Sequence, residues 1–227
     1  YLNRCCENYP THELGPIAKL LDINRGNRIM TVSSFASKSA GLSEYIKTRV
    51  DATDEMKAAN FAQGDIITTV LTCARGETIL LRLDTTLPRS YSRDFTVRGT
   101  KGLYMQDTNS VFLDGDEESF EPVEYYVKAL NNAVKFEDEY LPDIWKSVTE
   151  EMLKAGHGGM DWFAYMGFTD ALINSEEMPV DVYDAATWQA VAVLSEMSIK
   201  QGGAPQIMPD FTNGKWFKRP RKDVCRL

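Results

Sequence analysis

The stretch that decides the fold runs Asp65-Ile-Ile-Thr-Thr-Val-Leu-Thr-Cys-Ala74, then Arg75-Gly76-Glu77, then Thr78-Ile-Leu-Leu-Arg-Leu-Asp-Thr-Thr86. Both long runs are rich in the β-branched residues that are enriched in strands. The short connection between them contains a glycine, which is typical of a hairpin. We therefore predict two paired antiparallel strands over residues 65–74 and 78–86.

Further strand patterns lie on either side of this hairpin. Residues 28–35 alternate two sets of side chains, and three short strand-like runs follow the hairpin at 94–97, 102–105 and 110–113. Residues 38–60 are polar and mixed, and we expect short helices there in a long insertion. The connections after the hairpin are too short for the crossovers that parallel strands need, so we expect an antiparallel meander.

Helical patterns occupy both ends of the chain. Apolar residues recur at helical spacing in four segments, 12–23, 136–153 (with Pro142 in its first turn), 161–172 and 184–199. Strands in one block with helices on either side predict an α+β fold. We expect one large, mainly antiparallel open sheet flanked by helices.

Composition places the chain among ordinary folded domains. It has 227 residues, 25 Lys and Arg against 33 Asp and Glu, and a net charge of −8. That acidic balance argues against a nucleic-acid binder, which normally carries a basic face. The longest uncharged stretch, Ala185–Ser195, is far shorter than the ~20 residues that span a bilayer. We expect one domain over 1–227 that binds neither nucleic acid nor membrane.

The two ends of the chain carry separate expectations. It begins at Tyr1 rather than Met, and we expect a piece of a longer protein whose N-terminal part holds any targeting signal. The compartment, cytoplasm or periplasm, therefore stays open. Residues 215–227 carry six basic residues but only Trp216 and Phe217 as aromatics. We expect a solvated basic C-terminal extension rather than a nucleic-acid patch.

Several common functional motifs are missing from the sequence. It has no GxGxxG and no GxxxxGK[ST], the two usual glycine-rich cradles for phosphate. It also has no GxSxG elbow and no HExxH. The four cysteines form no CxxC pair, so we expect no metal site, and they leave the redox compartment open. A nucleotide cofactor would have to bind outside these residues.

One compact polar cluster, Asn8-Tyr9-Pro-Thr-His12-Glu-Leu-Gly-Pro16, stands at the start of the first helix. Thr11 is placed to cap that helix, with Tyr9 and His12 flanking its first turn. The helix dipole disfavours a protonated histidine there, which favours a neutral imidazole able to act as a base. His12 could equally pack or cap at this position.

Two other clusters are open to functional and structural interpretations. The glycines around His157, in Ala155-Gly-His-Gly-Gly-Met-Asp161, could let the backbone approach a ligand or could form a helix–helix turn. Tyr91 and Arg93, at the end of a predicted strand, could contact a sugar or a carboxylate, or could form a solvated edge.

Taken in order, the motifs resemble the substrate domain of the Gfo/Idh/MocA oxidoreductase superfamily. More narrowly, they resemble the NAD-dependent α-N-acetylgalactosaminidases of glycoside hydrolase family 109. The resemblance covers nearly the whole chain through Tyr9-Pro-Thr-His12, Leu14-Gly-Pro16, Leu21-Asp-Ile-Asn-Arg-Gly26, Tyr91-Ser-Arg93, Gly99-Thr-Lys-Gly102, His157-Gly-Gly-Met-Asp161, Asp181-Val-Tyr-Asp-Ala-Ala186, Leu194-Ser-Glu196, Gly202-Gly-Ala-Pro205 and Pro209-Asp-Phe-Thr-Asn-Gly-Lys-Trp216.

This resemblance implies a reaction and a cofactor. An N-terminal Rossmann domain, absent from this chain, would bind NAD, and the sheet domain would present an N-acetylhexosaminide or related sugar. The implied reaction is oxidation at C3, elimination, addition of water and re-reduction, which needs no paired carboxylates. It further implies a homo-oligomer that associates through the sheet face. We expect the isolated chain to be inactive.

The resemblance also assigns residues. It implies that His12 and Tyr9 are catalytic, with His12 as acid or base for the leaving group or water. It implies that Tyr91, Arg93 and His157 bind substrate; no cofactor-binding residue is assigned. The family usually has Gly after the motif histidine, where this chain has Glu13. A sugar dehydrogenase of the same superfamily, and a non-catalytic oligomerisation or carbohydrate-binding module, are the alternative functions.

Overall fold

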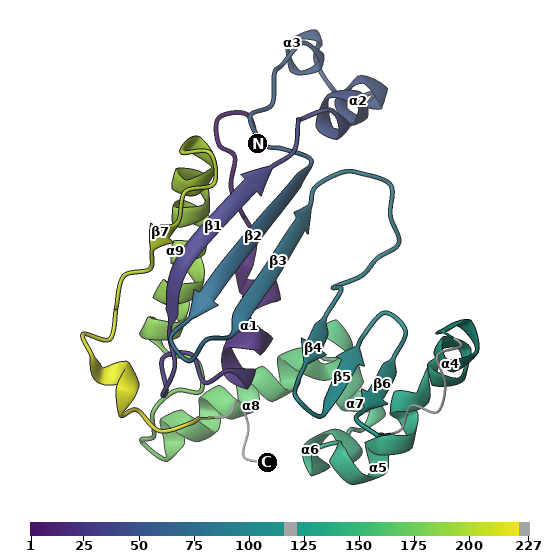
Figure 1. The fold of residues 1–227 in the computed structure, drawn as a ribbon, viewed down its shortest axis with the longest axis vertical. Helices are drawn as coiled ribbons and strands as arrows, with labels where there is room; N and C mark the ends of the chain where they lie inside the picture. Colours follow the sequence, from purple (N-terminus) through teal and green to yellow (C-terminus); the bar gives the residue numbers. More distant parts are fainter. Residues whose placement is uncertain (116–121, 223–227) are drawn as a thin grey trace. The chain divides into compact units, whose positions relative to one another are not determined.

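The computed structural model describes residues 1–115 and 122–222 (Figure 1). The chain divides into two compact units: Tyr1–Pro88 with the chain from Phe163 onward, and Arg89–Trp162. A four-stranded sheet belongs to the first unit and a three-stranded sheet to the second. The predicted α+β class with antiparallel pairing is confirmed, and the last three predicted strands form a small sheet of their own.

The four-stranded sheet has the order β3-β2-β1-β7. Its members are β1 (Ile29–Ala36), β2 (Ile66–Cys73), β3 (Thr78–Asp84) and β7 (Gln206–Ile207). All three pairings are antiparallel, so the predicted hairpin between β2 and β3 is confirmed. β7 was not predicted because two residues are too few to show an alternating pattern; it pairs Ile207 with Thr31 at the edge of β1.

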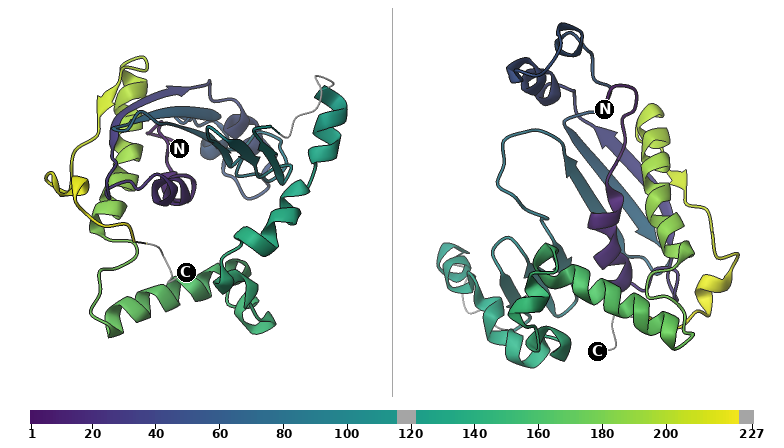
Figure 2. Two further views of the ribbon diagram at one scale, coloured as in Figure 1. Left: turned by 60° about the horizontal axis from the view of Figure 1, so that its bottom comes forward. Right: turned by 180° about the vertical axis from the view of Figure 1, so that it is seen from behind.

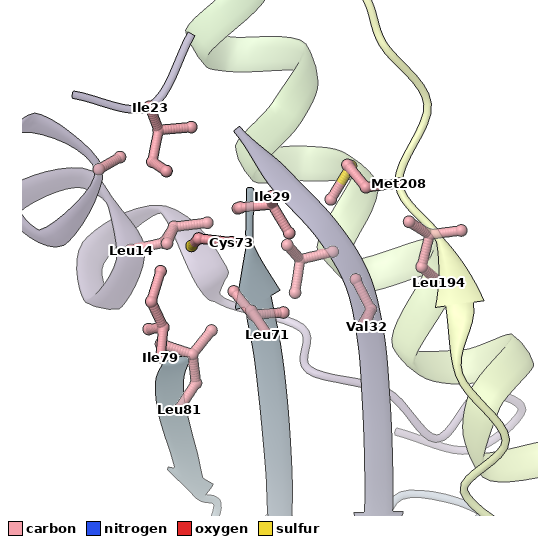
Figure 3. Close-up of a cluster of buried hydrophobic side chains, with 12 residues drawn as sticks. Leu14, Ile23, Ile29, Val32, Leu71, Cys73, Ile79, Leu81, Leu194 and Met208 are labelled. Carbon is pink, nitrogen blue, oxygen red and sulfur yellow. The ribbon is translucent and has the colours of Figure 1, made fainter. Parts of the chain in front are cut away.

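Two helices cover one face of this sheet, α1 (Pro10–Leu20) and α9 (Val182–Lys200) (Figures 1 and 2). They were expected at 12–23 and 184–199. Between them and the strands lies the core shown in Figure 3. Each such fully buried aliphatic side chain stabilises the fold by roughly 1.5–3 kcal/mol. The core consists of Leu14, Ala18, Ile23, Ile29, Val32, Leu71, Cys73, Ile79, Leu81, Val191, Leu194 and Met208.

The opposite face of the four-stranded sheet carries exposed side chains. Phe35, Leu80 and Ile207 are 56%, 64% and 78% exposed, and Phe35 and Leu80 alternate with buried residues of β1 and β3. Thr31 and Thr72 hydrogen-bond through their hydroxyls across β1 and β2, 2.6 Å apart. Within the described part of the first unit, both covering helices lie on the other face.

The insertion between β1 and β2 holds two short helices, α2 (Gly41–Thr48) and α3 (Asp54–Lys57), as predicted. Asp65, at the start of β2, fixes the entry to α2. Its carboxylate accepts the backbone N–H groups of Ala40 and Gly41 at 2.9 and 2.8 Å.

The second unit contains the sheet β4-β5-β6 and a series of short helices. Its elements are β4 (Thr96–Arg98), β5 (Gly102–Met105), β6 (Ser110–Leu113), α4 (Pro122–Ala129), η1 (Asn132–Phe136), α5 (Glu137–Tyr140), α6 (Asp143–Lys146), α7 (Glu150–Leu153) and η2 (His157–Gly159). The unit boundary falls in the first turn of α8 (Met160–Ile173), which was predicted at 161–172.

The single long helix predicted over 136–153 is wrong. Leu141 precedes Pro142 and adopts an extended backbone, with ψ of 126°, because the proline ring disfavours the helical conformation before it. Pro142 is therefore the N-cap of α6 rather than a residue of its first turn. Thr149 then begins another helix, its side chain accepting the backbone N–H of Met152. The apolar residues of 136–153 keep helical spacing, but Pro142 and the Thr149 cap divide the segment into short helices.

A buried ion-pair network joins the end of α1 to the start of α9. Arg25 donates to Asp184 at 2.8 Å and to Asp181 at 3.2 Å, and both Arg25 and Asp184 are almost fully buried. Asp181 and Asp184 also form a capping box at the start of α9. Burial alone would raise the pKa of Asp184, but Arg25, with help from Lys19, holds that pKa below its usual value.

The C-terminal segment, residues 215–222, forms ion pairs with Asp181 of this network and with acidic residues near it. Arg219 pairs with Asp181, Arg221 with Asp22 at 2.5 Å, and Lys222 with Glu176 at 2.8 Å. The segment includes η3 (Lys215–Phe217), and the carbonyl of Trp216 accepts the Gly26 backbone N–H. Residues 215–222 thus form ion pairs with the first unit while Lys215, Lys218 and Arg221 stay exposed, and 223–227 lie outside the described residues. Spacing of basic residues alone does not reveal the acidic partners that neutralise them.

The helices of the described ranges include none long and apolar enough to cross a bilayer. Cys5, Cys6 and Cys73 are free thiols, and Cys225 lies outside those ranges.

We predict that Asp184→Asn lowers the free energy of unfolding by about 3–5 kcal/mol, because it leaves the buried Arg25 charge without its main partner. Urea denaturation followed by circular dichroism measures this loss. Asp51→Asn is the matched control, since Asp51 pairs with Arg49 at the surface and its loss should leave stability nearly unchanged. Equal effects of the two substitutions would contradict the importance of the buried pair.

Candidate functional site

The polar cluster at 8–16 lies at the start of α1. Tyr9 is the N-cap residue and Pro10 occupies the first helical position, which suits its fixed φ. The expected Thr11 cap is wrong, because the helix begins one residue before Thr11 and no side chain caps it. Pro16, inside the helix, has no N–H to donate to the carbonyl of His12.

Tyr9 and His12 form a stacked pair on the exposed side of this helix start. Their ring centroids are 4.5 Å apart with an interplanar angle of 22°. The hydroxyl of Tyr9 lies 3.4 Å from Nε2 of His12. Tyr9 is 54% exposed and His12 is also exposed, so both rings are open to a ligand. The structure thus brings together the two side chains that were predicted to be catalytic.

Glu13 is partly buried and has one carboxylate oxygen in the protein interior. Its Oε2 is buried without a hydrogen-bond partner, and it makes no ion pair with His12. Burial raises the pKa of Glu13 to about 7. The residue that departs from the family pattern therefore does not place its carboxylate against the imidazole.

Glu7 lies beneath the same motif and is fully buried. Neither of its carboxylate oxygens has a hydrogen-bond partner. Burial, with a smaller contribution from the charge of Glu13, raises the pKa of Glu7 to about 8, and the nearby Tyr9 backbone N–H offsets only part of this rise. Glu7 is therefore mostly protonated at neutral pH.

The backbone around Glu7 is held on both sides. Gln63 exchanges two hydrogen bonds with the Cys6 backbone, at 3.0 and 3.1 Å. The Glu7 N–H donates to Ser195 Oγ of α9 at 2.8 Å. On the next turn of α1, Trp188 of α9 packs against Gly15, where a Cβ would lie 3.6 Å from its ring. These contacts fix the helix start that carries Tyr9 and His12.

Tyr91 and Arg93 lie in the second unit, in the segment before β4. Nε of Arg93 donates to the Tyr91 hydroxyl at 3.4 Å, and both side chains are exposed, Tyr91 by 85%. Ser92 between them bonds Asp107 at 2.5 Å, which holds the segment against the turn before β6. The structure places these two predicted substrate ligands next to each other.

His157, the fifth predicted residue, lies in the glycine-rich turn before α8. Its Nδ1 is 2.9 and 3.0 Å from the two carboxylate oxygens of Asp161. The helix–helix turn interpretation is confirmed, since 157–159 forms a short 3-10 turn between α7 and α8, and close approach of a ligand to this backbone stays a prediction.

Sequence reasoning missed Glu7 and gave no role to Asp161. The spacing of four between His157 and Asp161 was no signal for this contact, because His157 has a φ of 45° and lies before α8, so the two residues do not share a helix. Nothing in the sequence around Glu7 indicates that it is buried, since its neighbours in space come from 63 and 195.

The described residues do not fit a dinucleotide cofactor. Both sheets are antiparallel, so the ranges 1–115 and 122–222 contain no βαβ unit whose glycine-rich turn would receive a pyrophosphate. In those ranges no three His, Cys, Asp or Glu side chains gather closely enough to hold a metal ion.

We predict that the stability of the chain falls as the pH rises from about 4.5 to about 8. The folded state binds the Glu7 proton more tightly than the unfolded state, whose pKa is near 4.5. Glu7→Gln should remove most of this slope, and at pH 9 it should be more stable than the wild type by on the order of 2–4 kcal/mol.

Urea denaturation at pH 5 and pH 9 tests this expectation. Glu44→Gln is the control, because the Glu44 side chain is 75% exposed. Parallel pH dependence in the wild type and Glu7→Gln would show that Glu7 is not the group responsible.

Known proteins match most of this chain. Residues 1–218 match the family model described as glycosyl hydrolase 109, C-terminal domain. The chain is 43% identical over 214 residues to a glycosyl hydrolase family 109 protein of Stenotrophomonas maltophilia (strain K279a), covering 94% of this chain and 45% of that protein. It is 41% identical over 211 residues to an alpha-N-acetylgalactosaminidase of Tannerella forsythia, covering 93% of this chain and 43% of that protein.

A similar match extends to an alpha-N-acetylgalactosaminidase of Shewanella oneidensis, 34% identical over 209 residues, with 92% of this chain and 45% of that protein covered. The chain thus spans less than half the length of these relatives. Because the family model covers nearly all of it, the chain belongs to glycosyl hydrolase family 109, as the C-terminal domain of that family.

Proposed function

We propose that this chain is the sugar-binding and catalytic part of an NAD-dependent glycosidase acting on an α-N-acetylgalactosaminide or a related N-acetylhexosaminide. The observation that carries the proposal is the stacked Tyr9–His12 pair, exposed at a rigidly held helix start. Two relatives named alpha-N-acetylgalactosaminidase, 41% and 34% identical to this chain, support the substrate class.

His12 is the proton-transfer group of this pair. Its imidazole donates a proton to the departing glycosidic oxygen or accepts one from the attacking water. The Tyr9 hydroxyl, 3.4 Å from Nε2, contacts a sugar hydroxyl and orients the ring. Because the Glu13 carboxylate has a buried oxygen and makes no ion pair with His12, it does not compete with the sugar for the imidazole.

In the proposal Tyr91 and Arg93 are sugar-binding residues. A phenol and a guanidinium next to each other offer donors and an acceptor that suit sugar hydroxyls and an acetamido carbonyl. In the proposal they bind and orient the substrate and take part in no bond-breaking step.

The proposal places the dinucleotide on polypeptide outside these residues. The antiparallel sheets offer no pyrophosphate site, and the relatives are about twice the length of this chain. The roles assigned to this chain are therefore limited to proton transfer and sugar binding, and the 227 residues alone should show no turnover.

We predict that His12→Ala lowers kcat at least about 10²-fold in a polypeptide that includes the preceding half, because a positioned acid–base group contributes about 10²–10⁴-fold. The assay uses an aryl α-N-acetylgalactosaminide with NAD. Thr11→Ala is the matched control, since Thr11 is adjacent but caps nothing. Full activity in His12→Ala would refute its catalytic role.

The same assay separates the glycosidase from a sugar dehydrogenase. A glycosidase of this type returns its hydride, so NADH does not accumulate, whereas a dehydrogenase forms NADH from a free sugar in proportion to turnover.

We also propose that the chain associates with a second copy through the open face of the four-stranded sheet. The exposed apolar side chains Phe35, Leu80 and Ile207 on that face support this. Leu80→Lys should shift the protein toward the monomer in light scattering at fixed concentration. Leu20→Lys, on α1 and 49% exposed, serves as the control. A wild type that stays monomeric at high concentration would refute the association.

A further inference from the structure

We propose that Glu7 is a positioning residue for the Tyr9–His12 pair: its uncharged side chain keeps the two rings stacked, and its ionisation releases them. The inference deepens the proposed function and rests on it for the catalytic value of the pair. Glu7 itself touches no substrate in this proposal, and it acts through the backbone that leads into α1.

The Glu7 side chain is enclosed at the start of that helix. It is 0% exposed, and neither carboxylate oxygen has a hydrogen-bond partner. Only Asn8 separates Glu7 from Tyr9, the N-cap of α1, and His12 lies in the first turn. A displacement of the buried carboxyl group therefore acts directly on the turn that carries both rings.

The backbone on both sides of the carboxyl group is anchored. Gln63 exchanges two hydrogen bonds with the Cys6 backbone, and the Glu7 N–H donates to Ser195 Oγ at 2.8 Å. That hydroxyl donates in turn to the Ala192 carbonyl at 2.9 Å, so it is fixed on α9. The Glu7 carboxyl group can reach water only if this segment gives up its bonds to Gln63 and Ser195.

The charges around Glu7 do not neutralise a carboxylate there. The titratable groups that interact with Glu7 or with its neighbour Cys6 are Glu13 of α1, Glu196 of α9, and Arg4 and Cys5 of the N-terminal segment. Arg4, the cation of this set, donates to Glu196 at 2.6 Å rather than to Glu7. The loop that supplies Gln63 adds Asp65, whose carboxylate accepts the N–H groups at the start of α2.

A buried carboxylate without a partner is unfavourable, so it either stays protonated or moves into water. Burial, with a smaller contribution from Glu13, raises the pKa of Glu7 to about 8. Below that pH the neutral carboxyl group remains packed, whereas above it ionisation favours a conformation in which the carboxylate is hydrated. Because the backbone must open to reach that conformation, Tyr9 and His12 then lose the stacking that holds their ring centroids 4.5 Å apart.

Packing alone does not require a carboxyl group at this position. Glutamine has nearly the same shape and stays neutral at every pH, so it would fill the same space. The carboxyl group adds only a dependence on proton concentration. Glu7→Gln therefore separates positioning that follows protonation from simple packing.

The stacking is measurable on the 227-residue chain by NMR, because the sequence has only two histidines. Nuclear Overhauser effects between the rings of Tyr9 and His12 should weaken at least about threefold from pH 6.5 to pH 9.5 in the wild type, and should persist in Glu7→Gln. Glu44→Gln is the control and should behave like the wild type, since that side chain is 75% exposed. Constant ring–ring signals in the wild type, or an equal loss in Glu7→Gln, would overturn the proposal.

Activity is then measured in the polypeptide that includes the preceding half. Between pH 7 and pH 9.5 the wild-type kcat should fall at least about tenfold more than that of Glu7→Gln, which should lose this alkaline limb of the pH–kcat profile. The same alkaline limb in both proteins would overturn the inference, and the proposed function would stand if His12→Ala still removed turnover. The NMR transition without any turnover would refute the proposed function and leave the positioning role of Glu7 intact.

Discussion

The ion pair between Arg25 and Asp184 is the contact on which the arrangement of the first unit depends. It joins the loop after α1 to the first turn of α9, and both partners are buried. Asp181 of the same turn also receives Arg25 and Arg219, so the C-terminal segment meets the network at this point. The direction of α1 relative to α9 is thereby fixed, and the start of α1 carries Tyr9 and His12. An electrostatic contact after one end of the helix thus helps to set the position of the Tyr9–His12 pair at the other end.

Much of the first unit follows from local patterns. The hairpin of β2 and β3 combines β-branched runs with a glycine turn, and α9 is a long apolar run closed by glycines, so both were predicted within a few residues. The division of 136–153 into short helices was not predicted, because the extended residue before Pro142 and the Thr149 cap override the apolar spacing. β7 exists only through its pairing with β1, a contact between residues far apart in sequence.

The candidate site likewise combines contacts that are local in sequence with contacts that depend on long-range packing. Each predicted pair is local in sequence: Tyr9 with His12, and Tyr91 with Arg93. His157 was predicted without its partner Asp161, four residues further on. Spacing therefore indicates which side chains can meet. The burial of Glu7, by contrast, depends on Gln63 and Ser195, which approach from distant segments. Long-range packing of this kind leaves no pattern in a single sequence.

The order of the two units along the chain bears on how the protein forms during synthesis. Residues 89–162, the whole second unit, leave the ribosome before α9 and β7, which complete the first unit. Because domains fold as units while the chain emerges, the second unit can form while β1, β2 and β3 still lack α9, one of their two covering helices. Until α9 arrives, Val32, Leu71 and Leu81 have an incomplete core. The half-made sheet is thus the species most exposed to aggregation on the nascent chain.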